Sequence, residues 1–257
     1  MSGMIRAAVV CFALISCAAP PPTAAEVRAE VEAEVDVARR LMLLEAHVHR
    51  NPNSADAALW LARAYRDQGD ERAAEGFQRA IALDERHAIA RVEYGYSLVE
   101  PDLRRGRQPE PETLAEARRW VEAAYAIEPT CDRRHDLIGL LDLAAGTPSV
   151  ADRSLVESGL AACPEERWQR AWSATLGRML RSSGERAEAE VRLCRAVALG
   201  NAGALSACQA LAGDASCAHV REGSEKAKGK ATLSDAFAAA LAACGSSTGT
   251  TRGTLPG

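Results

Sequence analysis

The amino-acid sequence predicts an all-α protein, a row of helical hairpins packed one on another. Composition is the first observation: 47% of the 257 residues are hydrophobic but only 4% are aromatic, and alanine, leucine, arginine and glutamate are plentiful. Such a composition favours helices and disfavours a β-sandwich. The second observation is the stretch 172–200, where two segments with a helical apolar period are separated by Gly184. Glycine can take the left-handed backbone that ends a helix, so this stretch predicts one hairpin.

The spacing within this stretch resembles one tetratricopeptide repeat (TPR). Leu176-Gly177 is followed three residues later by Leu180, and the second segment repeats at steps of four and three through Ala189, Leu193 and Ala196. The small residues at 177 and 189 let the two helices approach closely. The resemblance implies a right-handed solenoid of hairpins, whose first helices line a concave, protein-binding surface.

The first 19 residues read as a lipoprotein signal peptide. Arg6 is followed by the apolar run Ala7–Ile15, which is too short to span a bilayer comfortably. The run ends in Ser16-Cys17 and resembles the bacterial lipobox, which implies that Cys17 carries acyl chains such as palmitate. The next residue, Ala18, favours the outer membrane. The protein is therefore expected in the cell envelope, lipid-anchored and facing the periplasm; the alternative is an ordinary secretory signal.

Two segments separate this signal from the repeats. Residues 20–25 contain three consecutive prolines and predict a stiff, extended tether. Residues 26–50 predict one long helix, because Val27, Val31 and Val35 recur at steps of four and Asn51-Pro52 ends the pattern. We expect this helix to cap the repeat array, although a dimerising coiled coil is an alternative.

Residues 52–213 are predicted to form the array of about four hairpins. The hairpins are expected at 56–83, 85–127, 132–164 and 172–200, and the second helix of the third, 150–162, is the least regular. The second hairpin is interrupted at 100–111, where three prolines and one glycine exclude a continuous helix. This insertion is expected to be a surface loop, either a functional one or a tolerated spacer.

The C-terminal part continues the helical pattern less regularly. Residues 202–211 predict one more helix, and 213–229 are expected to be irregular and lysine-rich. An alanine-dominated helix at 231–244 completes a capping region over 214–244, and the Ser/Thr/Gly-rich tail 245–257 is expected to be disordered.

Six cysteines remain after the signal region. Their places on successive helices predict three disulfides, Cys131–Cys163, Cys194–Cys208 and Cys217–Cys244. Cysteines on stacked hairpins also resemble those of Sel1-like secreted repeat proteins. Six buried thiols are the alternative, since cysteine packs well in helix cores. No CxxC or HxxxH spacing indicates a metal site.

No catalytic motif stands out. The five histidines do not fall in a nucleophile or metal pattern, and the sequence has no glycine-rich phosphate loop and no G-x-S-x-G. We therefore predict neither an enzyme nor a cofactor. The net charge of −4 is mild and does not indicate nucleic-acid binding.

The predicted concave surface is the candidate functional site. The repeat phase places six residues on it, mostly arginines: Arg63, Arg66, Tyr96, Arg133, Arg178 and Arg181. Arginine forks suit carboxylates, so a groove for an acidic or C-terminal peptide of an envelope protein is one hypothesis, and a solvated arginine face is the other. The sequence thus predicts a lipid-anchored, periplasm-facing scaffold for envelope assembly, of open oligomeric state, or alternatively a soluble, secreted, disulfide-stapled Sel1-like protein.

Overall fold

The computed structural model describes residues 24–34, 36–143, 149–212, 216–228 and 231–246. Within these residues every regular element is a helix, and no β-strand is found. The helices are α1 (Ala24–Ala33), α2 (Val37–Arg50), α3 (Ala55–Asp67), α4 (Arg72–Leu83), α5 (Ala88–Arg104), α6 (Pro111–Ile127), α7 (Cys131–Leu141), α8 (Val150–Ala162), α9 (Glu166–Ser182), α10 (Arg186–Ala198), the short 3₁₀ helix η1 (Ala202–Ala204), α11 (Leu205–Ala212), α12 (Ser216–Ala227) and α13 (Ala231–Ser246).

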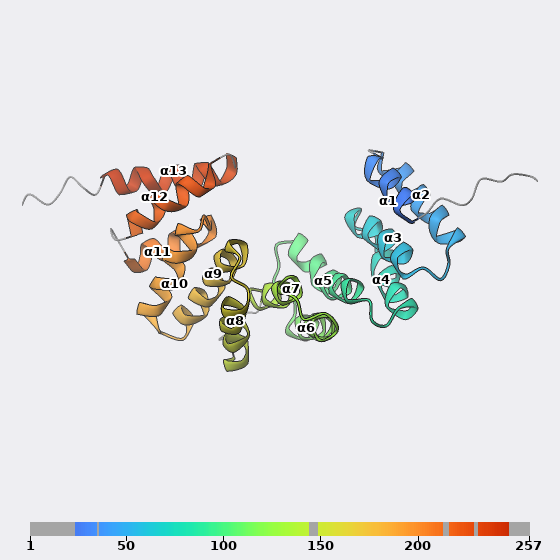
Figure 1. Cartoon of the computed structure of the whole chain (residues 1–257), viewed down its shortest axis with the longest axis horizontal. Helices are drawn as coiled ribbons and strands as arrows, with labels where there is room; N and C mark the ends of the chain where they lie inside the picture. Colours follow the sequence, from blue (N-terminus) through green and yellow to red (C-terminus); the bar gives the residue numbers. More distant parts are fainter. Residues whose placement is uncertain (1–23, 35, 144–148, 213–215, 229–230, 247–257) are drawn as a thin grey trace, which may run out of the picture.

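The helices stack as an open arc. Figure 1 shows α1 and α13 at the two ends of the arc, with α4, α6 and α8 along its outer side and the first helices α3, α5, α7 and α9 nearer the inside. The predicted hairpins correspond to α3/α4, α5/α6, α7/α8 and α9/α10. The predicted all-α hairpin solenoid is therefore confirmed.

Local chemistry sets the ends of these helices. The Ser54 hydroxyl accepts a hydrogen bond from the backbone N–H of Ala57 at 3.2 Å and so caps α3. Between α9 and α10, Gly184 has a φ of 85°, the left-handed conformation expected of this glycine. The glycine signal is local to the turn, which is why the sequence could predict the α9/α10 hairpin.

Close backbone approach holds the two helices of three of the hairpins together. A Cβ atom placed on Gly76 of α4 would lie 2.7 Å from Ala62 Cβ of α3. A Cβ on Gly95 of α5 would lie 2.8 Å from the carbonyl oxygen of Ala117 in α6. In the fourth hairpin, a Cβ on Gly177 would lie 2.6 Å from Leu193 Cγ. The absence of a side chain therefore brings each pair of helices into direct contact.

The N-terminal segment differs from the single helix expected over 26–50, because it forms two helices, α1 and α2. The Asp36 carboxylate accepts from the backbone N–H of Arg39 at 2.8 Å and caps α2. The Arg40 guanidinium donates to the carbonyl oxygen of Glu34 at the break. An aspartate that caps a new helix favours ending the preceding one. The valine spacing alone therefore predicted one continuous helix where the chain forms two.

Half of the insertion expected at 100–111 is helix, so this prediction was wrong in extent. Helix α5 continues through Pro101 to Arg104, and only residues 105–110 connect it to α6. Pro101 lies in the last turn of α5, where its missing N–H removes only one helical hydrogen bond. The Arg104 guanidinium holds this turn by donating to Glu100 Oε1 at 2.8 Å and to the carbonyl oxygen of Arg66 at 2.7 Å.

The segment 213–229 is not irregular as expected, because it contains helix α12. The side chain of Val220 is fully buried, and a Cβ on Gly223 would lie 2.6 Å from the ring of Phe237 in α13. Lys226, Glu222 and Glu225 of α12 are exposed, and both residue types are good helix formers, so the lysine content that suggested irregular structure is compatible with a helix. The region 214–244 therefore contains a helical hairpin, α12/α13, and not one capping helix.

Several predictions lie outside the described residues: the signal peptide with Cys17, most of the 20–25 tether and nearly all of the 245–257 tail. Among the described helices, none is long and apolar enough to cross a bilayer. The described residues also contain no group of three or more potential metal ligands.

Candidate protein-binding groove

A polar ladder connects the successive first helices, which lie nearer the inside of the arc (Figure 1). We define this concave ladder by Arg63, Arg66, Glu93, Tyr96, Asp136, Asp142, Thr175 and Arg178. At its N-terminal end, Arg63 Nε of α3 donates to Glu93 Oε1 of α5 at 2.8 Å, and Arg66 pairs with the other oxygen of the same carboxylate. The Glu93 side chain is only 17% exposed, so these ion pairs are partly shielded from water.

Tyr96 forms the next connection, between α5 and α7. Its hydroxyl donates to the carbonyl oxygen of Asp136 at 2.7 Å. A Cβ on Gly139 would lie 2.5 Å from the Tyr96 hydroxyl oxygen, so the glycine makes room for the phenol. Burial raises the pKa of Tyr96, and the nearby carboxylates of Asp136 and Asp142 raise it further. Tyr96 is therefore a fixed link between two hairpins and not a free contact for a ligand.

The last connection joins α7 to α9. Arg178 of α9 donates to Asp142 Oδ1 at 2.7 Å, and the Thr175 hydroxyl donates to Asp142 Oδ2 at 2.9 Å. The Arg133 guanidinium forms ion pairs with Asp136 of α7 at 2.5 Å and with Glu128, which precedes α7, at 3.2 Å. Arg181 is exposed, and its side chain has no hydrogen bond or ion pair with the described residues.

The six residues predicted from the sequence thus lie on the first helices, but four of the five arginines are neutralised. Their carboxylate partners Glu93, Asp136 and Asp142 were not predicted as part of the site. Helical spacing could have found two of them, because Glu93 lies three residues before Tyr96, and Asp136 three residues after Arg133. Asp142 follows the end of α7, and helical spacing did not indicate that it belongs to the site.

An apolar cavity adjoins the N-terminal end of the ladder, and the sequence did not predict it. Its volume is about 320 Å³ and it lies between α1, α2 and α3. Its apolar walls are formed by Val31, Val37, Leu44, Trp60 and Ala64, and its polar rim by Arg28, Glu32, Arg40, Arg63, Asp67 and Gln68. Arg63 belongs to both the rim and the concave ladder, so the cavity and the ladder are contiguous.

One charge on this rim is not cancelled by a carboxylate. Arg28 pairs with Glu32 at 2.7 Å, and Arg63 pairs with Glu93. Arg40, in contrast, donates only to the backbone carbonyl of Glu34 in the described part of the chain. The cavity therefore combines an apolar interior with one guanidinium group whose positive charge is available to a ligand.

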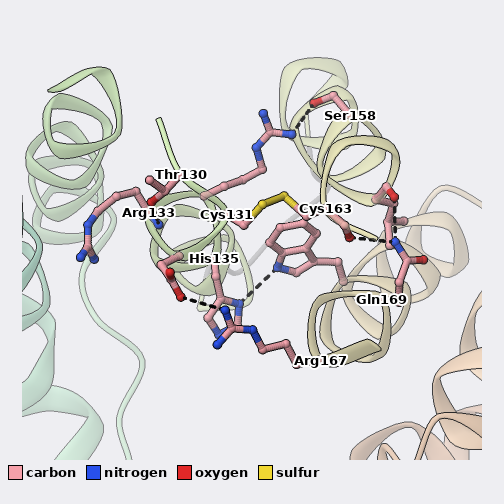
Figure 2. Close-up of a disulfide and its surroundings, with 12 residues drawn as sticks. Thr130, Cys131, Arg133, His135, Ser158, Cys163, Arg167 and Gln169 are labelled. Carbon is pink, nitrogen blue, oxygen red and sulfur yellow. Dashed lines mark hydrogen bonds and ion pairs between the residues drawn. A yellow bond between two sulfur atoms is a disulfide. The ribbon is translucent and has the colours of Figure 1, made fainter. Parts of the chain in front are cut away.

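Three disulfides join the six cysteines, and the pairing is the one expected from the sequence. Cys131–Cys163, Cys194–Cys208 and Cys217–Cys244 have Cα–Cα distances of 6.1, 5.0 and 5.6 Å. Figure 2 shows the first of them where α7 begins and α8 ends, with His135 and Arg167 close by.

The amino-acid sequence matches no protein-family model and no curated protein. The structure is similar to solved TPR-type structures. MamA superposes with a TM-score of 0.52 at 18% identity, over 66% of this chain and 92% of that one. A thermophilic TPR protein of Thermus thermophilus gives 0.50 at 18% identity (83% and 95%), and PilF of Pseudomonas aeruginosa gives 0.50 at 17% (82% and 90%). On the strength of this likeness in structure, the chain has the helical-hairpin solenoid fold of TPR proteins.

Proposed function

We propose that this protein is a scaffold that binds a segment of another protein on the inner side of its arc. The observation that carries the proposal is the N-terminal cavity, which combines apolar walls with a polar rim, as binding sites do. The solenoid fold supports it, because stacked hairpins build an extended concave surface suited to holding a chain segment. The concave ladder keeps this surface rigid, since its side chains are already fixed by one another.

The proposed ligand is a segment with a bulky apolar side chain and neighbouring acidic residues. The apolar side chain would fill the cavity against Trp60, Val37 and Leu44. A carboxylate next to it would pair with Arg40, whose charge lacks a carboxylate partner among the described residues. Arg181 offers a second unpaired guanidinium farther along the inner side, at the end of α9. The paired arginines between them contribute little, because a ligand would have to displace Glu93 or Asp142.

Matched substitutions on α2 test the cavity. Val37 lines it and is 52% exposed, whereas Met42 is 69% exposed on the same helix and does not line it. We expect Val37→Glu combined with Arg40→Glu to weaken binding of synthetic peptides containing leucine or phenylalanine flanked by glutamates by about tenfold or more, because the change adds negative charge to an apolar site. Met42→Glu should leave binding unchanged. Fluorescence anisotropy of labelled peptides measures the affinities.

The same peptides separate the parts of the proposal. Equal binding of lysine-flanked peptides would contradict the acidic preference but not the cavity. An equal loss in Met42→Glu and in the double variant would show that the cavity is not the binding site. Circular dichroism spectra of the variants should match that of the unmodified protein, because the substituted side chains are exposed or partly exposed.

The proposed location is the periplasmic side of the outer membrane, through a lipid on Cys17. The support is the lipobox-like sequence ending in Ser16-Cys17, followed by the three prolines of the tether. In a bacterial host fed with radiolabelled palmitate, we expect the protein to be labelled and to sediment with membranes. Cys17→Ala should abolish the label and release the protein from the membrane fraction, because no other acyl anchor is proposed. An unlabelled native protein in the soluble fraction would favour the secreted, Sel1-like alternative.

A further inference from the structure

The third hairpin, α7/α8, is packed differently from the other three. In the other hairpins a glycine of one helix meets the partner helix of the same hairpin. In the third, Gly139 of α7 meets Tyr96 of α5, and a Cβ on Gly159 of α8 would lie 2.9 Å both from Arg134 Cδ of α7 and from the Trp172 ring of α9. The nearest atoms to these two glycines are therefore side-chain atoms, those of Tyr96 and Trp172 from the neighbouring hairpins and that of Arg134 from α7, whereas Gly76 and Gly95 approach backbone atoms of the partner helix.

The core is divided at the same place. Leu137 and Leu140 of α7 pack with Val121 and the other buried residues of α5 and α6. Val156 of α8 packs instead with Trp172 and the buried residues of α9 and α10. The division is bridged by Ile138, Leu141 and Cys131 of α7, which pack with the α8/α9 cluster, and by the partly buried Leu155 of α8, which packs with both clusters. A seam thus separates a unit ending with α7 from a unit beginning with α8.

The links across the seam between α7 and α8 include two long ones, a 3.4 Å hydrogen bond from Arg134 to Ser158 and a 3.7 Å ion pair between Asp132 and Arg167, and several shorter ones. The disulfide Cys131–Cys163 is the covalent one and joins the first residue of α7 to the residue that ends α8. Close to it, Trp172 Nε1 donates to His135 Nδ1 at 3.2 Å, and Figure 2 draws this bond. On the concave ladder, Asp142 accepts from Thr175 and Arg178. Arg118 of α6 forms an ion pair with Asp152 of α8 at 2.7 Å.

We propose that the seam between α7 and α8 is the hinge of this solenoid and that Cys131–Cys163 is a redox-sensitive clasp that holds it closed. With the disulfide intact, the first residue of α7 is tied to the end of α8. Without it, α7 stays with the N-terminal unit through Tyr96, Leu137 and Leu140, and α8 stays with α9. The Asp142 bonds are then the part of the concave ladder that opens. The hinge does not depend on what the groove binds.

The chemical step is exchange with a dithiol. The thiolate of the dithiol attacks Sγ of Cys131, which is partly exposed, whereas Cys163 is only 3% exposed. A bond forms between the attacking sulfur and Cys131, and the Cys163 sulfur leaves as a thiolate and takes up a proton. The second thiol of the reductant then displaces Cys131 as a second thiolate, which is also protonated. The dithiol becomes a cyclic disulfide and loses two electrons, and the cysteine pair gains them.

Hydrogen exchange measured by mass spectrometry on the full chain tests the hinge. We expect Cys131→Ser with Cys163→Ser to speed amide exchange in α7 and α8 at least about tenfold, while α3, α4 and α10 change by less than about twofold. Cys194→Ser with Cys208→Ser is the matched control, because this disulfide lies inside one continuous core cluster. Its removal should affect α10 and α11 and leave α7 and α8 as they are. Small-angle scattering should show a larger maximum dimension for the first variant alone.

Two results would overturn the proposal: unchanged protection in α7 and α8, or equal loss of protection in all hairpins. If the double serine variant does not fold, the native protein can be titrated with dithiothreitol and its free thiols trapped with iodoacetamide. Alkylation of Cys131 and Cys163, with exchange rising only in α7 and α8, supports the clasp. Loss of protection in all hairpins on their reduction contradicts it.

Discussion

Replacing Trp172 by alanine is expected to lower the free energy of unfolding by about 4 kcal/mol, since removing a fully buried tryptophan leaves a cavity that its neighbours fill only partly. The Trp172 side chain is completely inaccessible to solvent. Its ring stacks on Trp168 with centroids 5.5 Å apart and fits against Gly159 of α8. The substitution therefore removes the side chain that fills the core between the third and fourth hairpins.

Urea unfolding followed by far-ultraviolet circular dichroism measures this change. Trp172→Phe is the matched variant, because it keeps an aromatic ring but cannot donate to His135 Nδ1. We expect it to lose about 1–2 kcal/mol, the contribution of the hydrogen bond and of the smaller ring. A loss below about 1 kcal/mol for alanine would show that this part of the core is not packed as described.

Replacing Gly95 by leucine is expected to cost about 3 kcal/mol or more, because a side chain there would force α5 and α6 apart. The first carbon of that side chain alone would lie 2.8 Å from the carbonyl oxygen of Ala117 and 2.9 Å from Val121 Cγ2. The carbonyl belongs to the backbone of α6 and cannot rotate away. Leucine is a better helix former than glycine by nearly 1 kcal/mol, so intrinsic propensity predicts the opposite sign.

The control for this substitution is Ala126→Leu, an enlargement at an exposed position of α6 in the same hairpin. We expect this variant to change the free energy of unfolding by less than about 0.5 kcal/mol, because nothing is displaced. Both variants can be compared by thermal and urea unfolding. If the two destabilise equally, the close approach of α5 and α6 at Gly95 is not the cause.

Much of the fold could be predicted because it is encoded locally. The 3.6-residue period, Gly184 and the glycine-containing approaches at 95 and 177 each act within one hairpin. The cysteine pairing could also be predicted from the order of the helices, since only cysteines on neighbouring helices are close enough to form a disulfide. The break at Asp36 and the helix through Pro101 were missed for a different reason. A cap competes with a continuing apolar pattern at the first, and tertiary contacts of Arg104 maintain the helix at the second.

The candidate site was only partly predictable. The repeat phase placed Arg63, Tyr96 and Arg178 on the first helices, but it could not show that Glu93 and Asp142 would neutralise the arginines. Such pairing depends on the rotation and spacing of neighbouring hairpins, which a single repeat does not specify. The cavity was missed because it lies between three helices, one of which ends where the sequence suggested that it would continue.

The concave ladder has a consequence for how fast a partner arrives. Guanidinium and carboxylate groups held a few ångströms apart cancel each other's field beyond about one Debye length, roughly 8 Å at physiological salt. The paired residues of the concave ladder therefore add no long-range attraction for a charged partner. With only Arg40 and Arg181 left without a carboxylate partner among the described residues, association should be close to the rate of an unsteered encounter, about 10⁵–10⁶ M⁻¹s⁻¹, with a shallow dependence on ionic strength. Selectivity then resides in how long a bound segment stays, which its fit to the cavity determines.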